Sequence, residues 1–169
     1  MISAYFDNTA RFMWTINYNR FVKWDYEKRL IVKDIRLPYD EEDELDLPLG
    51  GGDEGTDGFR DLHFTKDGRY YFIQNNIHQL FLMSTETDEI VHKLEKNILG
   101  SGKHIVKSMV ASLDSKFLFI AGTGGLVQWS IDKRKVCKKY EGFANYWVNS
   151  MMVTPDKKFL ILTTESGDL

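Results

Sequence analysis

Several features of secreted, membrane and nucleic-acid-binding proteins are missing from this sequence of 169 residues. It contains one cysteine, Cys137, which excludes an internal disulfide and favours a reducing, cytosol-like compartment. No apolar stretch approaches the roughly 20 residues of a membrane span, and the first residues lack the basic head and long apolar centre of a signal peptide. The formal net charge of -3 argues against affinity for nucleic acid or membranes. We therefore expect a globular protein of the cytoplasm.

The groups that would carry catalysis or hold a metal ion are also sparse. The histidines are scattered singly, and none has another at metal-ligand spacing: His63, His78, His92 and His104. The segment Gly100–Lys103 is similar to the end of a phosphate-binding loop, but it lacks the Ser or Thr after the lysine, and a strand is expected to follow it instead of a helix. The sequence therefore predicts no catalytic residue, no metal site and no cofactor.

The sequence does contain one pattern of residues that occurs four times. An aspartate stands in a predicted turn just before an apolar run at four places: Asp7, Asp67, Asp114 and Asp156. Apolar residues stand five and three positions before each aspartate, and another stands five positions after it. Aspartate favours turns because its side chain hydrogen-bonds the backbone two residues on. The repeated pattern therefore predicts one recurring supersecondary unit.

The third copy gives the clearest view of this unit. Its sequence predicts strands over 105–112, 117–121, 126–131 and 135–140, separated by turn residues that include a Gly-rich hairpin at 122–125. The second copy follows the same order, the first begins inside its first strand, and the fourth ends near the hairpin after its second strand. The unit is thus four short antiparallel strands, of which the lysine-rich fourth is expected at a sheet edge.

The spacings between the four aspartates are 60, 47 and 42 residues, and the longest contains an interruption, Pro38–Gly58. A four-stranded repeat of about 40–45 residues is the period of a β-propeller blade. We therefore expect an all-β fold, an open arc of a larger propeller with about three and a half blades. The blade segments are 1–37, 59–96, 104–142 and 147–169.

The Asp turn, the central apolar strand and a tryptophan near the end of the third strand resemble the WD-repeat family. Trp24-Asp25 is the dipeptide of that family, Trp129-Ser130 is a weakened form, and the second copy has Leu82-Met83 there. The Gly-His pair of the family is absent, so the blades are divergent. The resemblance implies a protein-binding scaffold, with the missing blades supplied by the rest of the chain or by a partner. Lactonase-like and quinoprotein-like propellers have similar Asp-turn blades, and an enzyme of that type is the alternative.

The segment 38–58 is the one strongly acidic part of the sequence. It holds nine carboxylates and no basic residue, and it does not match the alternating acids of a calcium loop. Three interpretations stay open: a solvated loop, a docking site for a basic partner protein, and a metal site. The candidate docking residues are Glu41, Glu42, Asp43 and Glu44.

Overall fold

The computed structural model describes residues 3–7, 9–17, 20–35, 59–75, 79–100, 105–143 and 148–164. These residues form strands and turns, and no helix occurs among them. The prediction of an all-β fold is therefore confirmed. The acidic segment 38–58, including Glu41, Glu42, Asp43 and Glu44, lies outside the described residues.

The strands group into four sheets that follow one another along the sequence. Sheet 1 contains β1 (Ser3–Phe6), β2 (Phe12–Asn17), β3 (Arg20–Asp25) and β4 (Leu30–Ile35). Sheet 2 contains β5 (Phe59–Phe64), β6 (Tyr70–Asn75), β7 (Leu80–Ser84) and β8 (Ile90–Lys93). Sheet 3 contains β9 (Val106–Ala111), β10 (Phe117–Gly122), β11 (Gly125–Ser130) and β12 (Lys135–Tyr140). Sheet 4 contains β13 (Val148–Val153) and β14 (Leu160–Thr164).

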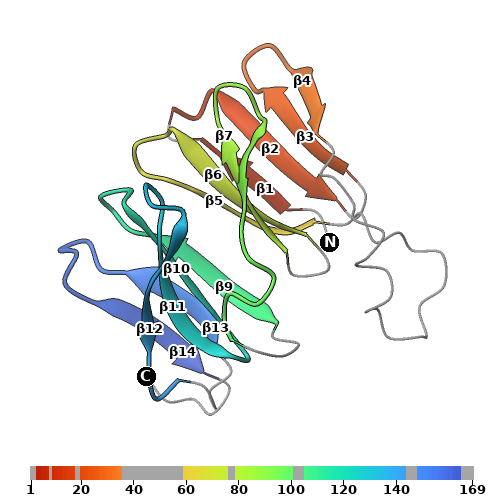
Figure 1. The fold of residues 1–169 in the computed structure, drawn as a ribbon. Coiled ribbons are helices and arrows are strands. Elements are labelled where there is room, and N and C mark those ends of the chain that lie inside the picture. Colours follow the sequence, from red (N-terminus) through yellow and green to blue (C-terminus); the bar gives the residue numbers. More distant parts are fainter. Residues whose placement is uncertain are drawn as a thin grey trace.

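In every sheet each strand pairs in antiparallel fashion with the next strand along the chain. Figure 1 shows the sheets in series, from sheet 1 at the upper right to sheet 4 at the lower left. The first strands are neighbours from sheet to sheet, because β5 contacts β9 and β9 contacts β13. Tyr5 of β1 reaches β5 as well, where its hydroxyl donates to Asp61 Oδ1 at 3.2 Å. Successive four-stranded sheets with adjacent first strands are the arrangement of propeller-like blades.

Three apolar clusters hold the series together, one at each interface between successive sheets. In β6 the side chains alternate between two clusters: Tyr71 and Ile73 pack towards sheet 1, whereas Phe72 packs towards sheet 3. Because sheet 2 is covered on both faces, β6 is buried along almost its whole length, and its first four residues are apolar or aromatic. Burial of each large apolar side chain contributes about 1.5–3 kcal/mol.

A hydrogen-bonded pair of a hydroxyl and a carboxylate recurs in the turn between the first and second strands of each sheet. In three copies a hydroxyl donates to the aspartate two residues on: Thr65 to Asp67, Ser112 to Asp114 and Thr154 to Asp156. The hydroxyl oxygen accepts the backbone N–H five residues ahead, and the carboxylate accepts the N–H two residues ahead. The residue after each aspartate adopts a left-handed φ, between 58° and 72°. Each pair therefore closes its turn through short-range hydrogen bonds.

In the first copy the two partners exchange positions. Asp7 N donates to Phe12 O, which is the bond that Thr65 makes in the second copy. The Asp7 carboxylate accepts from Thr9 Oγ1 at 2.6 Å and also from the N–H of Phe12 at 3.2 Å. Asp7 is thus equivalent to Thr65 and not to Asp67. The predicted equivalence of Asp7 with Asp67 was wrong by two residues. The exchange is possible because hydroxyl and carboxylate oxygens can both accept a backbone N–H.

The end of the third strand is a second repeated feature. Trp24, Met83 and Trp129 occupy one position, because in each sheet the pairing with the fourth strand shifts just before this residue. The next residue caps the following turn by accepting a backbone N–H three residues on: Asp25 from Lys28, Ser84 from Thr87 and Ser130 from Lys133. The second copy therefore carries Met83-Ser84 here, and the sequence prediction of Leu82-Met83 was wrong by one residue.

The predicted glycine hairpin of the third copy joins β10 to β11. Gly122 and Gly125 face each other across a two-residue turn. Gly125 has a left-handed φ of 116°. Gly122 is needed for a different reason, since a Cβ atom there would lie 1.9 Å from the backbone oxygen of Ile105.

Candidate functional site

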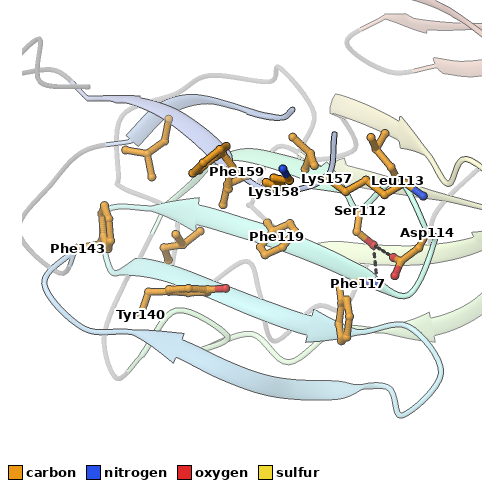
Figure 2. A pocket seen from close by; sticks show the side chains of 14 residues that line it. Ser112, Leu113, Asp114, Phe117, Phe119, Tyr140, Phe143, Lys157, Lys158 and Phe159 are labelled. Carbon is orange, nitrogen blue, oxygen red and sulfur yellow. Dashed lines mark hydrogen bonds between the residues drawn. The ribbon is translucent and has the colours of Figure 1, made fainter. Parts of the chain in front are cut away.

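An apolar hollow of about 500 Å³ lies between sheets 3 and 4. Its floor belongs to sheet 3 and consists of Phe119 of β10, Leu126 of β11 and Tyr140 of β12. Leu160 and Leu162 of β14 form the facing wall. We call the hollow bounded by these five residues the β14 groove. Figure 2 shows Phe119 and Tyr140 projecting into it from β10 and β12, the strands on either side of β11.

The rim of the β14 groove is formed by two equivalent turns. The turn before β10 supplies Ser112 and Asp114, and the turn before β14 supplies Lys157, Lys158 and the adjacent Phe159. Phe159 is 64% exposed, and both lysines are exposed. The groove therefore combines an apolar floor with a rim that carries two solvated cations.

The β14 groove lies where sheet 3 faces the two described strands of sheet 4. Between sheets 2 and 3, the third strand β11 fills the interface with Val127 and Trp129. Between sheets 1 and 2, the third strand β7 does the same with Phe81 and Met83. Sheet 4 has two strands within the described residues, so that part of the chain contributes no third strand against Phe119 and its neighbours.

The polar group in the floor is engaged within sheet 3. The Tyr140 hydroxyl donates to Gln128 Oε1 at 3.1 Å, and the Lys138 ammonium lies 4.5 Å from the centre of the Tyr140 ring. Burial raises the pKa of Tyr140, and the neighbouring Cys137 thiol adds to this shift. The phenol is therefore neutral at physiological pH, and the floor offers contact area without an ionised group.

Figure 2 also shows the Ser112–Asp114 pair at the rim of the groove. Ser112 Oγ donates to Asp114 Oδ1 at 2.6 Å, and the same carboxylate oxygen accepts the N–H of Lys116 at 3.2 Å. The hydrogen bond from Ser112 is the main reason that the pKa of Asp114 lies below its usual value. The ionised carboxylate therefore stabilises the turn from which β10 starts.

Replacing Ser112 with alanine should raise the pKa of Asp114 towards the ordinary value of about 3.9. Because the folded-state pKa is depressed, the pair contributes stability above roughly pH 4 and loses it as the pH falls through the folded-state pKa. NMR titration of the Asp114 carboxyl carbon measures the shift. Ser150→Ala, at an exposed hydroxyl on β13, is the matched control and should leave the titration of Asp114 unchanged. An unchanged Asp114 titration in Ser112→Ala would contradict the assignment.

The outer face of sheet 1 carries a second hollow, of about 480 Å³, lined by Met13, Trp24, Asp25, Tyr26, Glu27 and Arg29. Two exposed apolar residues extend this surface, because Phe6 pairs with Met13 and Ile31 pairs with Trp24. Trp24 Nε1 donates to Thr15 Oγ1 at 2.8 Å. Trp24 is equivalent to Trp129, which is buried against sheet 2. The outer face of sheet 1 therefore corresponds to the face of sheet 3 that packs against sheet 2.

A buried ion pair between sheets 1 and 2 was missed by sequence reasoning. Lys23 Nζ lies 2.8 Å from Asp88 Oδ2, and the two side chains are 6% and 4% exposed. Lys23 also donates to the carbonyl oxygen of Thr85 at 3.1 Å, and the Tyr71 hydroxyl donates to Asp88 Oδ1 at 3.3 Å. Burial, reinforced by the charge of Asp88, raises the pKa of Tyr71 far above its ordinary value, so the phenol remains a donor. These bonds join β3 and β6 to the turn before β8.

The residues that the sequence singled out occupy separate places. Asp7, Asp67, Asp114 and Asp156 lie in four different turns, and Asp114 alone of these lines the β14 groove. Of the histidines, His92 stacks on Trp129 with ring centres 5.7 Å apart, and His63 lies 3.2 Å from Asp61. Within the described ranges there is no group of three or more His, Cys, Asp or Glu side chains that could hold a metal ion. No helix of the described residues is long and apolar enough to cross a membrane.

The sequence signal for the groove was weak. The fourth strand of the third copy reads as a polar edge strand, and its one aromatic residue, Tyr140, is the part that enters the floor. Comparison of the sequence with models of known protein families and with curated proteins gives no match.

Proposed function

We propose that this chain is a non-catalytic, WD-repeat-type scaffold that binds other proteins in the cytoplasm. The observation that carries the proposal is the β14 groove, in which aromatic and aliphatic side chains of four strands border solvent beside an incompletely covered sheet. Apolar surface of this kind on a folded protein marks a site of interaction. The outer face of sheet 1 is a second such surface, so the series presents apolar area at both ends.

The chemistry of the groove favours binding over catalysis. Tyr140 and Asp114 are both engaged in hydrogen bonds within sheet 3. A hydrolytic or redox site needs a nucleophile beside a base, or several converging metal ligands. Aromatic residues in an apolar hollow with a charged rim are instead the composition of protein-binding sites.

The repeated turns support the WD-type part of the proposal. Trp24 and Trp129 occupy equivalent positions, each followed by a turn-capping side chain, and the hydroxyl–carboxylate pair recurs in every copy. A rigid series of sheets held by local turns is well suited to presenting loops and end faces to a partner.

Affinity purification with the 169-residue chain tests the proposal, using one charge variant at each apolar surface. Phe159→Glu alters the β14 groove and Tyr26→Glu alters the outer face of sheet 1; both side chains are more than half exposed, so folding should be preserved. We expect at least one protein partner to be retained by the wild-type chain and lost with one variant. Glu86→Gln, in an exposed turn of sheet 2, is the control and should retain all partners.

Two results would contradict the proposed function. One is a set of bound proteins that neither Phe159→Glu nor Tyr26→Glu changes. The other is hydrolysis or oxidation of a lactone or sugar by the purified chain, which would favour an enzymatic propeller instead.

A further inference from the structure

The outer edge of β14 carries backbone groups that point away from β13. Thr154 N donates to Phe159 O, which places the backbone groups of Phe159 on the side of β13. Because successive residues of an antiparallel strand bond to opposite sides, Leu160 and Leu162 direct their N–H and C=O groups outwards. Within the described residues β14 pairs with β13 alone. An edge of this kind is a template for an added strand.

The other sheets indicate which side chains a strand at this edge would carry. Leu160 is equivalent to Tyr71 of β6 and to Leu118 of β10, which lie opposite Met83 and Trp129 respectively. Two positions further along the second strand, the residues opposite are Phe81 of β7 and Val127 of β11. All four of these third-strand side chains are buried against the preceding sheet. The interface pattern is therefore two apolar residues at positions i and i+2.

The charge around the β14 groove selects among such strands. Lys157 and Lys158 are exposed at its rim, and Lys138 and Lys139 are exposed on β12. In the described residues from 105 onwards there are nine Lys and Arg against four Asp and Glu. The two aspartates of the neighbouring turns, Asp114 and Asp156, accept hydrogen bonds from their own turns. The groove therefore favours a partner that carries negative charge beside its apolar residues.

We propose that the β14 groove binds an extended acidic segment of a partner protein. The segment pairs antiparallel with the outer edge of β14 and places two apolar side chains, two residues apart, on Phe119 and Tyr140. Its acidic residues lie near Lys157 and Lys158. This inference rests on the proposed protein-binding function and specifies the partner chemistry at one of the two surfaces.

A synthetic peptide tests the proposal directly. The probe is a short, end-capped, fluorescently labelled peptide. It has one valine and one tryptophan two positions apart, and all of its remaining residues are glutamate or aspartate. We expect saturable binding to the 169-residue chain by fluorescence anisotropy. Replacing Lys157 and Lys158 together with glutamate should weaken binding about tenfold or more. Lys28→Glu, which changes one exposed charge on sheet 1, is the control and should leave binding almost unchanged.

Methylation of the peptide backbone separates strand addition from charge attraction. N-methyl groups on the valine and the tryptophan remove the N–H groups that face Leu160 and Leu162, so binding should be lost. The same groups on the intervening acidic residue should have a much smaller effect, because its N–H points away from β14. A peptide with lysine in place of every acidic residue should bind at least about tenfold more weakly.

Several outcomes would overturn the inference. Equal affinity of the unmethylated and methylated peptides would exclude strand pairing. Equal affinity of an all-glutamate peptide, or of a DNA oligonucleotide, would show that the basic rim attracts any polyanion. Loss of natural partners in Tyr26→Glu, with no peptide binding at β14, would overturn this inference and leave the proposed protein-binding function standing.

Discussion

Replacing Trp129 with alanine should lower the free energy of unfolding by about 3–5 kcal/mol. The side chain is fully buried at the interface of sheets 2 and 3. It meets the Phe72 ring edge to face, with centres 6.0 Å apart, and stacks on His92. Truncation would leave a cavity between two sheets whose backbones are held by their own hydrogen bonds. Urea unfolding followed by circular dichroism measures the loss.

Trp24 provides a matched control, because it occupies the equivalent position of sheet 1 on a face that is only partly covered. Trp24→Ala loses the hydrogen bond to Thr15 and part of a buried surface, so we expect a clearly smaller effect. Amide exchange should accelerate in β10 and β11 of the Trp129 variant and in β2 and β3 of the Trp24 variant. Equal losses from the two replacements would contradict the role assigned to Trp129 between sheets 2 and 3.

Removing the charge of Asp88 should be comparably destabilising. Asp88→Asn preserves the shape of the side chain and tolerates the left-handed φ of 55° at this residue. It leaves the buried ammonium of Lys23 without its counter-charge, although Lys23 still donates to the backbone of Thr85. Breaking a buried pair by changing one partner costs about 3–5 kcal/mol, and we expect a loss in this range by urea unfolding.

A double replacement distinguishes the ion pair from general disturbance of the interface. Lys23→Met removes the second charge, so the variant with both replacements should lose less stability than the sum of the two single variants. Lys28→Met, at an exposed lysine of the same sheet, should change stability by less than about 0.5 kcal/mol. Strictly additive losses from Lys23→Met and Asp88→Asn would show that the two side chains act independently.

The repeated unit could be predicted from the sequence because its main signals are local. Each turn is closed by hydrogen bonds between residues that lie no more than five positions apart, so Thr or Ser and Asp must appear at fixed spacing. The strands alternate or run apolar according to whether one or both faces are covered. The number of copies and the four-stranded order followed from these short-range rules.

The register within the repeat was harder to predict, because more than one type of side chain can make these short-range hydrogen bonds. Hydroxyl and carboxylate oxygens both accept a backbone N–H, so Asp7 and Thr9 could exchange roles without disturbing the turn. The irregular pairing before Met83 likewise displaced its equivalence with Trp24 by one residue. Residue identity alone does not reveal such shifts, because they alter hydrogen-bond partners while leaving the apolar pattern intact.

Composition and spacing were sufficient to establish an all-β series of four similar units, since turns and alternation are properties of neighbouring residues. Contacts between distant residues required the folded arrangement. Lys23 and Asp88 are separated by 65 positions, and a lysine within a strand does not specify which sheet will cover it. The β14 groove depends in the same way on Phe119 and Tyr140 of sheet 3 lying across from Leu160 and Leu162 of sheet 4. Long-range packing sets these features, because burial is decided by which faces meet.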